Sequence, residues 1–185
     1  MSNKTILTKL GACPEAVEWA SKYRSKQAAW AACKRGDWML WFCGKKSGPV
    51  GDPSRRKLVG AAAACARLAL PIWQKKYPKD DRVEKCLIAC EGYALGTVSD
   101  AELAAAQDAA GAAAGAATGY AAGAAQDAAW AAAWAAWAAR DAARDAARAA
   151  AWAAWAAQDA AGAAQDETLK RCADIVRSHY PEVPR

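Results

Sequence analysis

The sequence predicts an all-α fold, and two features of its composition carry that prediction. Alanine, the residue with the highest helix propensity, supplies 55 of the 185 residues. The β-branched residues that strands favour are scarce, with 7 Val and 4 Ile in the whole chain. These numbers exclude a β-sandwich and a parallel α/β sheet. We expect residues 1–185 to form a single-domain helical bundle of about 6–7 helices, with long, alanine-rich helices toward the C-terminus.

Capping and turn signals place three short helices in the first 43 residues. Cys13-Pro14-Glu15 is a typical helix start, since proline is tolerated in the first turn, and this helix should end between residues 21 and 26. A second helix is expected over residues 25–34. Asp37 is a candidate N-cap for a third helix over residues 38–43, because its carboxylate can accept a hydrogen bond from a backbone N–H group.

A loop and two longer helices should follow. Residues 44–53, with the sequence GKKSGPVGDP, form the clearest loop because they hold three glycines and two prolines. The next helix is expected from residue 55 to about residue 76, with Pro71 kinking or interrupting it. Another helix should run over residues 82–95, with Gly96 as its C-cap.

An alanine-dominated segment occupies residues 101–165. Ser99 and Glu102 form a capping-box signature at its start. Glycines recur at every fourth position from 111 to 123, and because each costs about 1 kcal/mol in a helix interior, we expect another helix to approach this ridge closely. A break near Gly119 is the alternative, so a single bent helix and an antiparallel hairpin both stay open.

Tryptophan and charged residues share one face of this segment. At 100° per residue, five tryptophans between residues 130 and 155 fall within about 60° of rotation, and Asp and Arg residues lie on the same side. One interpretation packs the alanine faces against neighbouring helices and leaves this stripe outside. The other makes it the wall of a cleft in which indoles stack on a planar ring and guanidinium groups bind phosphate. The candidate ligand-binding residues of the stripe are Trp134, Trp137, Asp141, Arg144, Arg148 and Trp152.

A second candidate site lies in the N-terminal half. Residues 34–41 are basic and aromatic, and residues 55–57 (RRK) begin a helix whose free backbone N–H groups favour anions. Together they could hold a phosphorylated ligand; the alternative is that the tryptophans belong to the core and the cations are solvated. The candidate ligand-binding residues here are Arg35, Asp37, Trp38, Trp41, Arg55 and Arg56.

Charge divides the chain into a basic and an acidic half. Residues 1–80 hold 16 Lys and Arg against 5 Asp and Glu, whereas residues 81–185 hold 9 against 14, which gives a net charge of +6. The helices of residues 1–96 should therefore be basic and the Ala/Trp-rich segment of residues 99–180 acidic. An anionic partner is one explanation, and packing of one half on the other is the alternative. Direct nucleic-acid binding is not favoured, because no helix-turn-helix or RNA-binding signature is present.

Several protein classes lack their signatures. The first ten residues hold no apolar stretch, so we expect no signal peptide, and polar residues interrupt the alanine-rich segment too often for a membrane span. The seven cysteines are expected to be reduced and buried, as in a cytoplasmic protein. His179 is the sole histidine and there is no Cys-x-x-Cys motif. We expect no metal, no cofactor and no enzymatic activity.

Several segments resemble a family of bacterial and phage immunity proteins. The likeness is carried by AWAACKRGDWMLW (residues 29–41), by residues 55–71, by YPKDDRV (residues 77–83) and by the tail up to residue 171. It implies an α-helical cytoplasmic protein that neutralises a harmful agent by binding it. Two functions compete: sequestration of an anionic immune signal, such as a cyclic nucleotide or cyclic ADP-ribose, and direct binding of a toxin protein. The basic N-terminal half favours the first, and self-association stays open for both.

Overall fold

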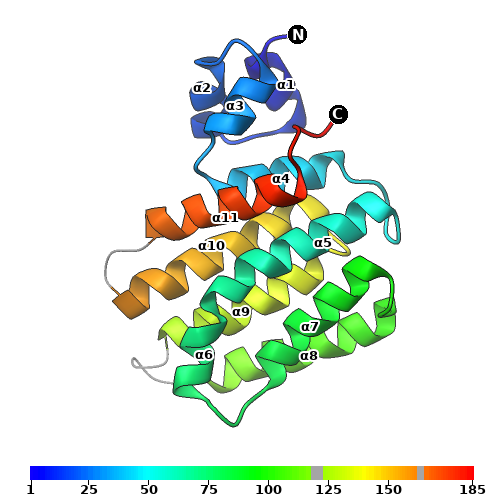
Figure 1. The fold of residues 1–185 in the computed structure, drawn as a ribbon, viewed down its shortest axis with the longest axis vertical. Helices are drawn as coiled ribbons and strands as arrows, with labels where there is room; N and C mark the ends of the chain where they lie inside the picture. Colours follow the sequence, from blue (N-terminus) through cyan, green and yellow to red (C-terminus); the bar gives the residue numbers. More distant parts are fainter. Residues whose placement is uncertain (118–122, 162–164) are drawn as a thin grey trace.

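The computed structural model describes residues 1–117, 123–161 and 165–185, and every regular element in these ranges is a helix. The all-α prediction is therefore confirmed. Figure 1 shows a body of stacked helices with α1 to α3 at one end. The elements are α1 (Asn3–Leu10), α2 (Pro14–Ser21), α3 (Lys26–Ala32), α4 (Gly36–Lys46), α5 (Pro53–Ala66), the 3₁₀ turn η1 (Arg67–Ala69), α6 (Leu70–Lys76), α7 (Arg82–Leu95), α8 (Asp100–Ala116), α9 (Gly123–Trp137), α10 (Ala142–Ala161) and α11 (Gln165–His179).

The described ranges hold eleven α-helices, so the prediction of about 6–7 was wrong. Pro71 accounts for one extra helix, because α5 gives way to η1 and α6 then starts with this proline in its first turn, where the missing N–H is tolerated. The alanine-rich segment is not one bent helix, because it forms α8, α9 and α10, each of which packs against the next. The hairpin alternative expected a break near Gly119, and α8 ends at Ala116 while α9 begins at Gly123. The second break, between α9 and α10, was not expected.

The start and end of α4 both differ from expectation. Arg35, not Asp37, occupies the N-cap position, and the Asp37 carboxylate instead accepts hydrogen bonds from Nε and Nη2 of Arg35 at 2.9 and 2.7 Å. The helix also continues to Lys46 through residues predicted as loop. Gly44 is buried there, and two lysines in the last turn favour the negative end of the helix dipole.

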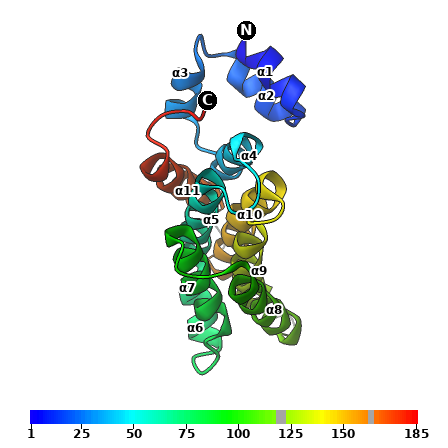
Figure 2. The same cartoon turned by 90° about the vertical axis from the view of Figure 1, so that its right-hand side faces the viewer.

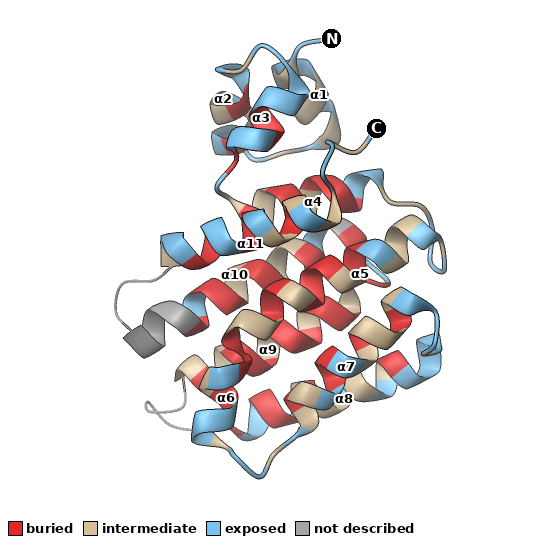
Figure 3. Ribbon diagram, in the orientation of Figure 1, coloured by how far each residue is buried: buried red, intermediate tan, exposed pale blue. Residues whose placement is uncertain are grey.

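Alanine packing holds the centre of the body together. The α9 helix contacts α10 on one side and α8, α7, α5 and α6 on others, and its buried face is almost entirely alanine. Figure 3 shows the buried residues gathered on the inner faces of α5, α9 and α10. Small side chains let these helix backbones approach closely, as one of the two interpretations of the stripe expected.

The first two glycines of the ridge do not mediate helix packing. A Cβ atom at Gly111 or Gly115 would meet no atom within 4 Å. The packing side of α8 is formed instead by fully buried alanines, Ala110, Ala113 and Ala114. Gly119 lies outside the described residues.

Helices α1 to α3 form a cap that stands beyond α4, as Figure 2 shows from a second direction. The cap buries few side chains, namely Ala16 and Ala20 on α2 and Ala29 and Trp30 on α3. Its backbone reaches the body through residues 33–35. No helix within the described ranges combines the length and the apolar character that crossing a membrane requires.

Candidate functional site

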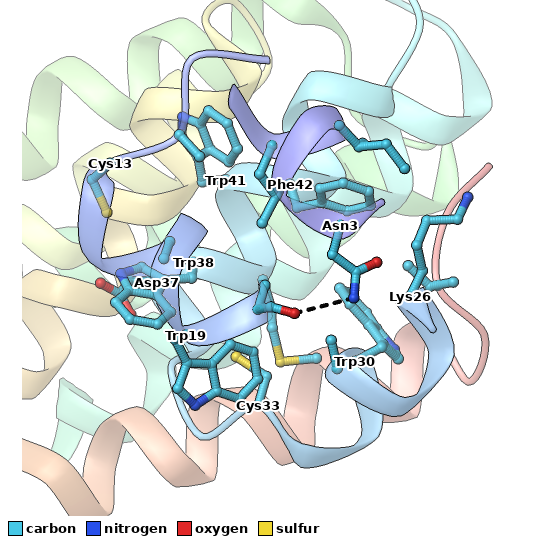
Figure 4. Close-up of a pocket in the computed structure, with 18 of the residues that line it drawn as sticks. Asn3, Cys13, Trp19, Lys26, Trp30, Cys33, Asp37, Trp38, Trp41 and Phe42 are labelled. Atoms are coloured by element: carbon cyan, nitrogen blue, oxygen red, sulfur yellow. Dashed lines mark hydrogen bonds between the residues drawn. The ribbon is translucent and has the colours of Figure 1, made fainter. Parts of the chain in front are cut away.

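A cavity of about 480 Å³ lies between the cap and α4. Its size falls within the range of about 300–1,000 Å³ that is typical of small-molecule sites. Ala147 of α10 and Val183 of the C-terminal segment complete the wall. Five of the twenty lining residues are aromatic, and Figure 4 shows these rings around the cavity: Trp19, Trp30, Trp38, Trp41 and Phe42.

Two pairs of rings join the cap to the body across this cavity. Trp19 of α2 lies 6.0 Å from Trp38, and Trp30 of α3 lies 6.3 Å from Phe42, measured between ring centroids. The α4 rings share one side of the helix because residues three and four positions apart are neighbours on a helix surface. The aromatic wall is therefore built half from the cap and half from one face of α4.

Cations surround the aromatic wall. The guanidinium carbon of Arg35 lies 4.4 Å from the Trp38 ring centroid, and the ammonium nitrogens of Lys45 and Lys46 lie 5.5 and 5.9 Å from the rings of Trp41 and Phe42. Such contacts are attractive because the face of an aromatic ring carries negative charge.

Most of this positive charge is uncompensated. Hydrogen bonding to Asp37 raises the pKa of Arg35, and the two groups form a neutral ion pair. Lys26 lines the cavity itself. Within the described part of the chain, none of Lys26, Lys45 and Lys46 has an acidic partner within 4.0 Å. The surroundings of the cavity therefore favour a ligand that carries negative charge.

Asn3 fixes the cap side of the cavity. Its side-chain amide donates hydrogen bonds to the carbonyl oxygens of Ala20, Tyr23 and Ser25 at 3.1, 3.0 and 3.3 Å, and Figure 4 draws the first of these. The amide thereby ties α1 to the turn between α2 and α3. The amide nitrogen of Asn3 is therefore already engaged in hydrogen bonds within the cap.

Two thiols lie on the cavity wall. Burial raises the pKa of Cys33 to about 11, so this thiol is protonated at neutral pH. Cys13 is exposed, in contrast to the other six cysteines, so the prediction that all seven are buried was wrong for this one. Cys13 is the N-cap residue of α2, outside the buried face of that helix. Within the described ranges, no cluster of three or more His, Cys, Asp or Glu side chains is placed to hold a metal ion.

The structure divides the N-terminal candidate residues. Asp37, Trp38 and Trp41 line the cavity, and Arg35 packs on one of its rings. Arg56 lies apart, with its guanidinium carbon 5.6 Å from the ring centroid of Tyr93 on α7.

Arg55 also lies apart from the cavity, and it has a structural role. Its guanidinium donates hydrogen bonds to Oγ of Ser47 and to the carbonyl oxygens of Gly48, Ala139 and Arg140, at 2.8–3.1 Å. The side chain therefore ties the loop after α4 to the turn between α9 and α10. The Arg55 guanidinium is therefore not free to bind a phosphate at the start of α5, where the sequence predicted a site.

The candidate residues of the stripe form a second cluster, on α9 and α10. The chain turns at residues 138–141, so the stripe is not continuous along one helix as expected but folds back on itself. Arg148 then stacks 4.4 Å from the ring centroid of Trp134, and the ring of Trp130 lies 6.4 Å from that of Trp152. Trp137 contacts Trp134 edge to face.

Acidic residues compensate the arginines of this Trp–Arg cluster. Arg144 lies 3.1 Å from Asp141 and 3.3 Å from Asp145, and Arg148 lies 3.9 Å from Asp145. Asp145 is buried, and this burial raises the pKa of its carboxyl group against the opposing hydrogen bond from Arg144. Two arginines facing two aspartates leave no excess positive charge for an anion.

Sequence reasoning missed the cap side of the cavity. Trp19 and Trp30 lie on separate short helices, and no spacing in the sequence connects either of them to α4. Each of these two helices carries one tryptophan and few other large apolar residues. This pattern predicts that the tryptophan is buried, but it does not predict which helix it packs against. The pairing is set by tertiary packing alone.

A scan against protein-family models, a search of the curated proteins and a search of the solved structures each found no match. The function of the cavity must therefore be inferred from its own residues.

Proposed function

We propose that the protein is a non-enzymatic binding protein that sequesters an anionic, nucleotide-derived signal molecule in the cavity between the cap and α4. The observation that carries this proposal is the partly open cavity of about 480 Å³, where Trp19 pairs with Trp38 and Trp30 pairs with Phe42 between the cap and α4. Stacking of a base on an aromatic ring contributes about 1–3 kcal/mol, and every base offers a flat face for it.

The charge around the cavity supports the anionic part of the proposal. A ring-bearing phosphate could place its base among the indoles and its charged group near Lys26 at the wall. Lys45 and Lys46 add two further positive charges beside the same rings. Lysine ammonium groups bind phosphate as mobile point charges, so they suit the rim of a site better than its interior.

Binding without turnover fits the reactive groups near the cavity. The Cys33 thiol is protonated at neutral pH because burial raises its pKa to about 11, and the single histidine of the chain lies outside the cavity wall. Together with the resemblance to immunity proteins, this favours neutralisation of an immune signal by sequestration.

A thermal-shift and calorimetric screen tests the proposal. The panel holds cyclic dinucleotides, cyclic trinucleotides, cyclic ADP-ribose isomers and linear nucleotides, and mass spectrometry reads each compound before and after incubation. We expect a clear shift with at least one compound, recovered intact after denaturation of the protein. Conversion of the compound would indicate an enzyme. No shift across the panel would favour the other role, binding of a toxin protein, which co-purification with that toxin would show.

A matched pair of variants locates the binding. Trp38→Ala removes a ring from the cavity wall, whereas Trp155→Ala removes an exposed indole of α10 outside it. We expect Trp38→Ala to lower affinity by at least about tenfold, as loss of one stacked ring implies, and Trp155→Ala to bind as the wild type does. Equal affinity of both variants would exclude the cavity as the site.

A further inference from the structure

The C-terminal segment after α11 closes one side of the cavity. Val183 lines the cavity, and its backbone N–H donates to Oε1 of Gln27 at 3.0 Å. The same Gln27 side chain donates from Nε2 to the carbonyl oxygen of Pro181 at 3.5 Å. The indole N–H of Trp30 donates to the carbonyl oxygen of Tyr180 at 3.0 Å. Three hydrogen bonds thus bind this segment to α3.

The other end of the segment is fixed to the body. It follows α11, which packs on α4 and α5, and the ammonium group of Lys57 lies 4.7 Å from the Tyr180 ring centroid. Arg177 of α11 donates from Nη1 to the carbonyl oxygens of Trp30 and Cys33 at 3.3 and 2.7 Å. The C-terminal segment therefore connects α3 to the body in addition to the chain connection at residues 33–35, which Arg177 also contacts.

The rest of the cap is held less firmly. Helices α1 and α2 pack mainly on each other, and the cap meets α4 chiefly through the paired rings across the cavity. The cavity is partly open to solvent, and a movement of the cap away from α4 would widen its opening. Such a movement must break the bonds between α3 and the C-terminal segment.

We infer that residues 180–183 act as a latch that holds α3 against the body and sets the rate at which the cavity exchanges its ligand. This inference rests on the proposed function, because a sequestering protein needs slow release. Two of the three latch bonds come from one exposed side chain, Gln27, and the longer of these two is 3.5 Å. Differences in affinity arise mainly through dissociation rates, which are the quantity such a latch controls.

Stopped-flow fluorescence tests the latch with a defined probe. Anilinonaphthalene sulfonate is an anion with flat aromatic rings, the two features that the cavity should bind, and its emission rises in an apolar site. We compare the full-length protein with Gln27→Ala, which loses two latch bonds, and with a chain that ends at residue 179. The control is Glu182→Ala, which alters an exposed side chain of the latch segment. We expect Gln27→Ala to release the probe about tenfold faster, and Glu182→Ala to release it at the wild-type rate.

Hydrogen exchange of the ligand-free proteins gives a second readout. Amides of α3 should exchange faster in Gln27→Ala and in the shortened chain, while those of α9 should not change. Wild-type probe release by both altered proteins, or unchanged exchange in α3, would overturn the latch and leave the proposed function standing. If the wild type does not bind the probe, or if Trp38→Ala binds it unchanged, the result counts against the proposed function. In that case the hydrogen exchange of α3 alone tests the latch.

Discussion

At the scale of single residues, Gly36 shows how closely α4 packs on α11. A Cβ atom at this position would lie 2.4 Å from Cβ of Cys172 and 2.8 Å from the backbone nitrogen of Ala173, both on α11. The first turn of α4 therefore touches the backbone of α11 directly. Only glycine allows this approach, and the approach sets the position of the three α4 rings on the cavity wall.

We predict that Gly36→Ala destabilises the protein by about 1–3 kcal/mol or more, because the added methyl group must push two helices apart. Gly111→Ala is the matched control, since a Cβ atom there would meet nothing within 4 Å. That change should stabilise the protein by up to about 1 kcal/mol, as alanine costs less than glycine in a helix interior. Urea unfolding followed by circular dichroism measures both. Equal effects of the two changes would contradict the close packing of α4 on α11.

Cysteine exposure gives a second prediction at this scale. Cys13 is exposed and six cysteines are buried, and burial raises the pKa of Cys33 to about 11. The thiolate is the reactive form, and at pH 8 the Cys33 thiol is almost wholly protonated. We therefore expect iodoacetamide to label Cys13 alone in the native protein, and all seven cysteines after unfolding. Mass spectrometry of labelled peptides checks this, and rapid native labelling of Cys33 would contradict it.

At the scale of elements, local signals predicted helix ends well where a residue type forces them. The capping box of Ser99 and Glu102 is present at the start of α8, Pro71 interrupts the helix after α5, and Gly96 ends α7 with a φ of 79°. The turn between α9 and α10, AARD at 138–141, holds neither glycine nor proline. Its alanines and arginine are good helix formers, and its one local signal is Asp141 directly before α10, where aspartate is favoured. The packing of α10 back onto α9 adds the tertiary contacts that favour the break.

The close packing of α9 on its neighbouring helices requires alanine at the buried positions of α9. Ala132 of α9 is fully buried, and its carbonyl oxygen lies 3.5 Å from Sγ of Cys86 on α7. We predict that Ala132→Leu costs about 1–3 kcal/mol of stability through overpacking. Ala105→Leu, on the exposed side of α8, should change stability by less than about 0.5 kcal/mol. Thermal unfolding compares the two, and similar melting temperatures would show that the helix contacts are looser than described.

At the scale of the whole molecule, the two candidate sites fall in separate places. Among the described residues, the cavity holds five aromatic rings and one unpaired cation on its wall, Lys26, with Lys45 and Lys46 beside two of the rings, whereas the Trp–Arg cluster of α9 and α10 balances its arginines with aspartates. Sequence reasoning could predict the α4 half of the cavity, since Trp38 and Trp41 stand three positions apart beside basic residues. It could not predict the cap half or the neutralised arginines, because both depend on contacts between elements far apart in sequence.

A crystal structure with the compound that gives the largest thermal shift tests the central claim most directly. We predict electron density for its ring between the cap and α4, in contact with Trp38 and Trp41, and density for its charged group on the side of Lys26. Density over Arg144 and Arg148 on the Trp–Arg cluster, with the cavity empty, would contradict the account.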